Sequence, residues 1–145
     1  MKNRAWLGFL LLLWALQSVA ADWERIRDQA ETDSKALAQL QRAARAGNAQ
    51  AAFYLGTLYA PPITKATRTV PKDWGKAIHW YQQAADWGDA KAAFDLGLAY
   101  EKGQGVAKDP AMARYYFRRM MALAAEAVGV PATHAEQVGT GNLPQ

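Results

Sequence analysis

The chain has 145 residues, a formal net charge of +4, a hydrophobic content of 51% and no cysteine. This length suits one domain with a single core, and the lack of cysteine excludes a disulfide-stabilised fold and a cysteine-linked lipid anchor. Residues 1–21 contain Lys2 and Arg4 but no acid, so the rest of the chain carries a charge of +2. A charge of this size gives little support for a nucleic-acid partner.

Residues 1–21 have the pattern of an export signal. The two basic residues precede an apolar run at positions 5–16, and small or polar residues follow. A charged start, an apolar centre of about 7–15 residues and a small-residue cleavage site define a secretory signal peptide. We therefore expect cleavage after Ala20 or Ala21 and a periplasmic or secreted protein. An uncleaved anchor is the alternative, although the apolar run is shorter than the ~20 residues that a spanning helix needs.

Residues 22–46 follow a helical pattern, with apolar side chains three or four positions apart. A break near Thr32 and Asp33 would divide this segment, and either residue could serve as the N-cap of the helix that follows.

The stretch that follows repeats itself. Residues 47–59 read GNAQAAFYLGTLY and residues 88–100 read GDAKAAFDLGLAY, which is a shift of 41 positions. The part that comes after each stretch repeats with a shift of 36, because the first loop is longer. Residues 33–46 match the second helix of this unit at the shift of 41, so we interpret them as half of a preceding repeat. Self-similarity at such a period is typical of stacked helix pairs.

Local signals mark where the helices begin and end. Gly47 and Gly88 are suited to the left-handed conformation that closes a helix, as Gly103 and Gly105 are to a tight loop. The predicted helices are 49–59, 74–86, 90–100 and 110–127. The residues that should cap them are Asn48, Asp73, Asp89 and Asp109. Pro110 falls at a first helical position, where its missing N–H is not needed.

Gly56 and Gly97 lie inside predicted helices, where glycine costs about 1 kcal/mol relative to alanine. We interpret them as positions where a neighbouring helix approaches closely. The large residues around them are predicted to form the core rather than a ligand-binding aromatic stripe. These residues are Phe53, Leu55 and Tyr59, with their copies Phe94, Leu96 and Tyr100.

The order A-x-x-x-L-G-x-x-Y-x-x-G-x-G-V-x-x-D-x-x-x-A-x-x-x-Y/F, complete from Ala92 to Phe117, resembles the Sel-one-like repeat (SLR), a relative of the tetratricopeptide repeat. The first copy lacks both loop glycines. The resemblance implies an all-α, right-handed α-solenoid of about two and a half helix-turn-helix units. The expected parts are a signal peptide (1–21), an SLR domain (22–127) and a flexible C-terminal tail (128–145). The domain divides into a half repeat (33–46), repeat 1 (47–86) and repeat 2 (88–127).

The sequence offers few residues for catalysis. After the signal peptide its only serine is Ser34 and its only histidines are His79 and His134. We find no nucleophile with a base at a useful spacing and no metal-ligand cluster, so we expect no enzyme activity, cofactor or metal. Some secreted relatives are linked to β-lactams, which leaves a hydrolase of that type as a minor alternative.

The resemblance implies a protein-binding module, acting as an adaptor or as an inhibitor such as an immunity protein. In the family the first helices line a concave binding face. The residues that the core pattern leaves free on that face are Gln50, Tyr54, Thr57, Lys91, Asp95 and Leu98. A peptidoglycan- or membrane-associated structural protein is the alternative, with contact through the basic residues Arg114, Arg118 and Arg119 of the last helix. The partner's identity and the oligomeric state stay open.

Overall fold

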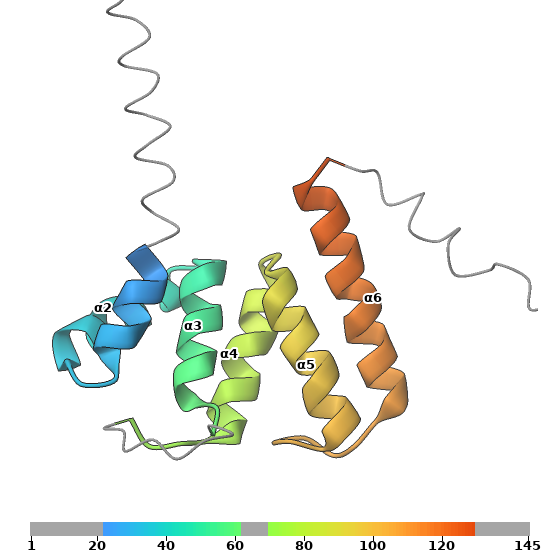
Figure 1. Ribbon diagram of the computed structural model, residues 1–145, viewed down its shortest axis with the longest axis horizontal. Helices are drawn as coiled ribbons and strands as arrows, with labels where there is room; N and C mark the ends of the chain where they lie inside the picture. Colours follow the sequence, from blue (N-terminus) through green and yellow to red (C-terminus); the bar gives the residue numbers. More distant parts are fainter. Residues whose placement is uncertain (1–21, 62–69, 130–145) are drawn as a thin grey trace, which may run out of the picture.

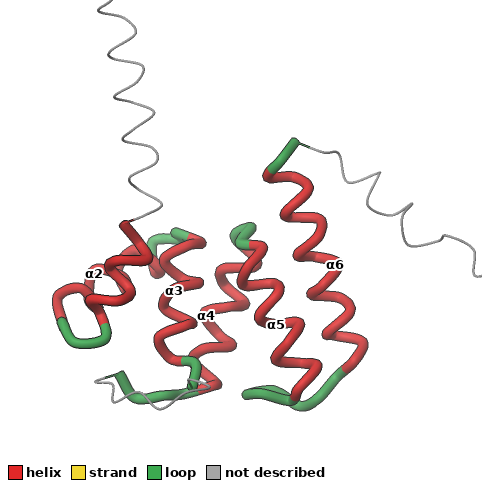
Figure 2. The backbone as a smooth tube through the Cα atoms, in the orientation of Figure 1, coloured by secondary structure: helices red, strands yellow, loops and turns green. Residues whose placement is uncertain are grey.

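The computed structural model describes residues 22–61 and 70–129, and within these ranges every regular element is a helix. A helical segment at 22–30 comes first. It is followed by α2 (Ser34–Arg45), α3 (Ala49–Tyr59), α4 (Trp74–Asp86), α5 (Ala90–Lys102) and α6 (Pro110–Ala127). Successive helices run antiparallel and pack side by side in chain order (Figures 1 and 2). The chain is therefore an all-α solenoid of helix pairs, as predicted.

The predicted helix boundaries are confirmed with two refinements. Helix α5 runs two residues past the expected end, to Lys102, and the break near residue 32 is real. Asp33, rather than Thr32, caps α2 by accepting a hydrogen bond from the Lys35 amide. The four predicted caps each accept a hydrogen bond from a backbone N–H of their own helix at 2.8–3.1 Å: Asn48, Asp73, Asp89 and Asp109.

Parts of the sequence-based interpretation fall on residues outside the described ranges. These are the predicted signal peptide (1–21), residues 62–69 of the first loop and the predicted tail from residue 130 onward. Among the helices that are described, none combines the length and apolar character that a membrane span requires.

The two repeats have the same backbone frame despite loops of different length. In the first, the Asp73 amide donates to the Tyr59 carbonyl at 2.9 Å; in the second, the Asp109 amide donates to the Tyr100 carbonyl at 2.9 Å. Gly47 and Gly88, at the joints between pairs, have φ values of +91° and +95°. The second helix thus begins at the same place relative to the first helix in each pair.

Paired small residues let the helices approach one another. Seven alanines on α3, α4 and α5 are fully buried: Ala51, Ala52, Ala77, Ala84, Ala85, Ala92 and Ala93. The largest fully buried side chains are leucines, Leu40, Leu55, Leu58 and Leu96. Because methyl groups rather than long side chains separate the helices, the core is thin and each pair relies on its neighbours for burial.

The interior glycines lie where a neighbour comes very close, but that neighbour is an aromatic ring. A Cβ added to Gly56 would lie 2.6 Å from the Tyr81 ring of α4, and one added to Gly97 would lie 2.5 Å from the Phe117 ring of α6. No real Cβ tolerates such distances. In each pair, an aromatic ring of the second helix therefore packs against the first helix, in the space beside its glycine.

The expectation that the aromatic copies fill the core is wrong in part. Phe53, Tyr59 and Tyr100 are only half-buried, and Phe94 is 43% exposed. Phe53 lies 6.0 Å from the Tyr81 ring and is covered by Lys91 of the next pair. Phe94 has the matching contact with Phe117, at 5.9 Å, but no described helix follows α6 to cover it.

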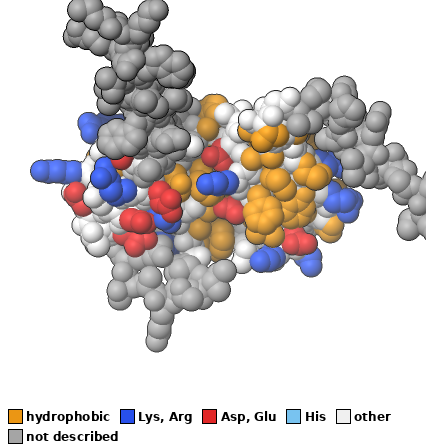
Figure 3. Space-filling model, turned by 45° about the horizontal axis from the view of Figure 1, so that its top comes forward, with side chains coloured by type: hydrophobic (Ala, Val, Ile, Leu, Met, Phe, Trp, Pro, Cys, Tyr) orange, Lys and Arg blue, Asp and Glu red, His pale blue; other side chains and the backbone are white. Residues whose placement is uncertain are grey.

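The two ends of the array differ. At the N-terminal end, Ile26 and Ala30 of the 22–30 segment are buried in the common core, so this segment covers α2 and α3. At the other end, α6 buries only Ala113, while Met121 is 51% exposed. Figure 3 shows hydrophobic side chains gathered over this α5–α6 end.

The two glycines should respond differently to alanine. Gly56→Ala would push against Tyr81, which is buried and hydrogen-bonded, and should lower the free energy of unfolding by about 1–3 kcal/mol. Gly97→Ala meets the half-exposed Phe117, which can move outward, and the gain in helix propensity of about 1 kcal/mol offsets part of the cost. Urea unfolding of both variants measures the difference. A Gly56→Ala protein as stable as the parent would contradict the packing described here.

Candidate functional site

The six residues predicted for binding lie on α3 and α5, the first helices of the two pairs. Gln50, Tyr54 and Thr57 follow one another at helical spacing on α3, as do their counterparts on α5. Gln50 and Lys91 are exposed, whereas the other four are half-buried. The structure brings five of the six to two separate hollows, which we call the upper and the lower hollow.

The upper hollow lies where α3 and α5 begin and α6 ends. It is lined by Gln50, Tyr54 and Lys91 of the predicted set, together with Phe53 and Leu123. The Tyr54 ring lies 5.2 Å from that of Phe53, and the Arg27 guanidinium lies 5.7 Å from the Tyr54 ring centroid. Tyr54 therefore has an aromatic and a cationic neighbour beside the hollow that it lines.

The lower hollow lies between α4 and the second half of α5, beside the end of α3. Its volume is about 460 Å³, and it is lined by two predicted residues, Asp95 and Leu98. The other residues that line it are Pro61, Trp74, Tyr81, Ala99, Lys102 and Gln104. Sequence reasoning missed Trp74 and Tyr81, although the equivalence of Tyr81 with Phe117 at the shift of 36 marked it as a packing position of the repeat.

Asp95 is the most perturbed carboxyl of the described residues. Burial raises its pKa to about 6, and the nearby charge of Asp89 adds to this effect. The Tyr81 hydroxyl donates a hydrogen bond to the Asp95 carboxylate, which favours the ionised form and opposes the shift. Burial likewise raises the pKa of Tyr81, so its hydroxyl keeps its proton and stays a donor.

Thr57 lines neither of these two hollows, and its hydroxyl donates to the carbonyl of Tyr54 at 2.7 Å. Tyr54 and Asp95, which occupy equivalent positions in successive repeats, line different hollows. The predicted residues therefore form two small sites along the first helices, not one continuous cluster.

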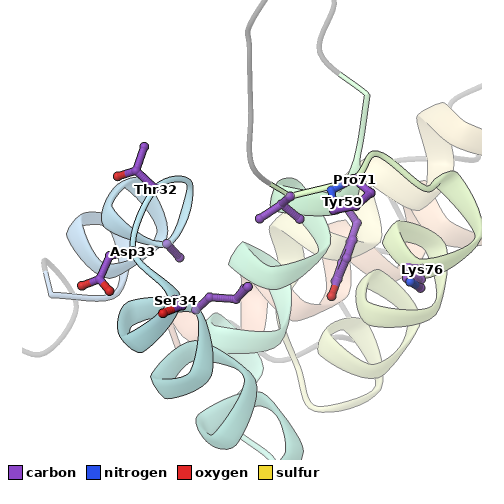
Figure 4. A pocket seen from close by; sticks show the side chains of 9 residues that line it. Thr32, Asp33, Ser34, Tyr59, Pro71 and Lys76 are labelled. Atoms are coloured by element: carbon purple, nitrogen blue, oxygen red, sulfur yellow. The ribbon is translucent and has the colours of Figure 1, made fainter.

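A third hollow separates α2 from the junction of α3 and α4. Thr32, Asp33 and Ser34 lie on one side of it, and Tyr59, Pro71 and Lys76 on the other (Figure 4). Its polar groups have local partners. Asp33 caps α2, and Lys76 lies 5.4 Å from the Tyr59 ring centroid and 3.9 Å from Asp73. This hollow has no side chain arranged for catalysis.

The described residues contain no group of three His, Cys, Asp or Glu side chains that could hold a metal ion. Ser34 is the first residue of α2. His79 is exposed on α4 and contacts only the Trp80 ring among the aromatic neighbours, at 5.2 Å. His134 lies outside the described ranges. The geometry thus suits recognition by shape, charge and aromatic contact.

The basic patch of α6 is smaller than predicted. Arg119 is half-buried, donates to the Ala85 carbonyl at 3.1 Å and lies 3.8 Å from Asp86. It satisfies the carboxyl end of α4 and is not available to a partner. Arg114 and Arg118 are exposed and remain the accessible cations of this helix.

Comparison with known proteins accounts for this architecture. The family model of the Sel1 repeat matches residues 49–89 and 90–124. The chain belongs to the Sel1 repeat family. Among solved structures it is similar to a Sel1 repeat protein from Oxalobacter formigenes, with 26% identity and a TM-score of 0.54 over 76% of this chain and 89% of that one. Among curated proteins, none matches.

The Sel1 repeats give the described part of the chain a helical protein-interaction architecture. Family membership explains why glycines and alanines recur at the helix contacts. It does not explain Asp95, which stands where the first Sel1 repeat has Tyr54. Several positions that differ between the two repeats line the hollows: Gln50 and Lys91, Tyr54 and Asp95, and Leu98.

The raised pKa of Asp95 predicts a pH-dependent stability. A carboxyl with a folded-state pKa of about 6 and an ordinary value of 3.8 destabilises the fold when it is ionised. This destabilisation is complete above pH 6 and disappears as the pH falls toward 3.8. Asp95→Asn keeps an acceptor for Tyr81, so its melting temperature should exceed that of the parent at pH 7.5.

The difference in melting temperature should narrow as the pH is lowered from 7 to 5, because the parent's Asp95 becomes neutral. Asp86→Asn, at an exposed carboxylate, is the matched control and should not reproduce this trend. A constant difference between parent and Asp95→Asn across this range would contradict the assignment.

Proposed function

We propose that this protein is an exported binding module that holds one partner protein of the cell envelope along its first helices, α3 and α5. The Sel1 repeat architecture supports a protein partner. The N-terminal pattern of two basic residues, an apolar run and small residues supports export. Its role is that of an adaptor or of an inhibitor such as an immunity protein.

The observation that carries this proposal is the pair of hollows on the first helices. Each combines aromatic side chains with charged groups, Asp89 and Lys91 in the upper hollow and Asp95 and Lys102 in the lower. Protein interfaces concentrate their binding energy in such places, where an aromatic anchor is surrounded by polar groups. One hollow lies at the start of α5 and the other beside its second half, which suits a segment of the partner that extends along the first helices.

Helix α6 offers a second candidate surface. Arg114 and Arg118 are exposed there beside Tyr115, which is 52% exposed. Exposed cations next to an aromatic side chain suit an anionic membrane surface. This observation favours a membrane-associated role as the alternative. The capture experiment below therefore includes a variant that lacks both arginines.

Export predicts a shortened chain. Cleavage at the small-residue site should give a protein that begins at Ala21 or Asp22 and is recovered in the periplasmic fraction. Mass spectrometry of the protein isolated from its native host measures the N-terminus. A full-length product retained in the membrane fraction would show that residues 1–21 act as an anchor instead.

Binding through the first helices predicts a selective loss of capture. Tyr54→Ala combined with Leu98→Ala removes one contact from each hollow and should reduce capture of the envelope partner at least tenfold, which is about 1.4 kcal/mol. Circular dichroism should remain helical. Quantitative pull-down from solubilised envelope measures the effect.

The control for this experiment is Arg114→Ala combined with Arg118→Ala, which changes two exposed residues of a second helix. Capture by this variant should match the parent. If it loses capture while the first-helix variant retains it, α6 is the binding surface and the proposal is wrong.

A further inference from the structure

We propose that the lower hollow binds an arginine side chain of the partner protein, with Asp95 as the carboxylate that pairs with its guanidinium. This inference rests on the proposed function, because it names the chemistry by which the partner enters one of the two hollows. Four features of the described residues support it: the identity of Asp95, its contacts, the walls of the hollow and its size.

The repeat does not require a carboxylate at position 95. The first repeat has Tyr54 at the equivalent place, and the helix forms equally well there. Asp95 lies in the middle of α5, so it does not cap a helix end, which is the role of Asp73, Asp89 and Asp109. Its charge therefore needs a reason other than the fold.

The charge of Asp95 is not neutralised within the described part of the chain. Its hydrogen-bond partner is the neutral hydroxyl of Tyr81, and the other charge acting on it is that of Asp89, which is also negative. Lys91, one turn earlier on α5, lies over the Phe53 ring in the upper hollow. Lys102 lines the hollow at the last residue of α5 and is exposed. A carboxylate held in this way attracts a cation from outside.

The walls select the kind of cation. Trp74 and Tyr81 contribute aromatic rings, and Pro61 and Leu98 contribute aliphatic surface. A guanidinium is planar, is weakly hydrated and stacks on aromatic faces, whereas an ammonium holds its water more strongly. A guanidinium can also form two parallel hydrogen bonds to one carboxylate. An arginine side chain can thus stack on the aromatic rings and also form hydrogen bonds to the Asp95 carboxylate.

The hollow is large enough for this occupant. Its volume of about 460 Å³ lies within the range of about 300–1,000 Å³ that is common for ligand sites. The upper hollow differs, because its carboxylate, Asp89, has the positive charge of Lys91 beside it.

The test uses N-acetyl-arginine-amide as the probe and N-acetyl-citrulline-amide as its neutral isostere. Both are added to the ¹⁵N-labelled protein at pH 7.5, and amide chemical shifts are followed. We expect the arginine probe to shift the signals of Asp95, Leu98 and Lys102 with a dissociation constant on the order of 1 mM, or about −4 kcal/mol. Asp95→Asn should weaken this binding at least tenfold, and Asp86→Asn should leave it unchanged.

Equal shifts from the citrulline probe, or unchanged binding by Asp95→Asn, would overturn the assignment, as would arginine-specific shifts confined to another region. The same variant separates this inference from the proposed function. If Asp95→Asn retains capture of the envelope partner while Tyr54→Ala with Leu98→Ala loses it, the arginine site is wrong and the binding face stands. If neither variant loses capture, the proposed function itself fails.

Discussion

The contact between an aromatic ring and a glycine determines the geometry of each helix pair. Tyr81 lies in the space beside Gly56, and Phe117 lies in the equivalent space beside Gly97. Any side chain in place of the glycine would meet the ring at less than 3 Å, so the distance between the two helices depends on this contact. The burial of the small alanines on both helices follows from that distance.

Tyr81 also connects the first pair to the second. Its ring packs on α3, while its hydroxyl donates to Asp95 of α5. Tyr81 thus packs within its own pair and contacts the next pair through the hydroxyl, the only polar group of its side chain. In the second repeat this position is Phe117, which has no hydroxyl, and no described pair follows it. Tyrosine thus occurs where a following pair offers a polar contact to its hydroxyl, and phenylalanine occurs where the described residues offer none.

The repeat frame leaves the side chains of the first helices free to differ, and this freedom gives the hollows their chemistry. The raised pKa of Asp95 indicates that its ionised form costs the fold stability, a cost that a neutral residue would not have. Groups that are kept at the expense of stability are typical of binding sites. The exposed Phe94 and Met121 have a different origin, because they lie at the end of the array, where the stacking that covers Phe53 is not continued by the described residues.

The sequence by itself determined the family, the helix boundaries and the close approach at Gly56 and Gly97. These features are local or periodic: a cap bonds to its own helix, a joint glycine turns the chain where it stands, and a repeat spacing places equivalent residues alike. Even the six binding candidates followed from this periodicity, since they are the positions that the packing pattern leaves open.

Only the tertiary structure decided how those candidates are grouped. Tyr54 and Asp95 are equivalent in sequence but line different hollows, because each hollow also takes its walls from other helices. The sequence places Arg119 in a basic surface patch, yet its guanidinium donates to the carbonyl of Ala85, 34 positions earlier in the chain. The bond from Tyr81 to Asp95 and the exposure of Phe94 likewise depend on which helix lies next to which. Such contacts join residues far apart in the chain, and a single sequence has no local pattern that records them.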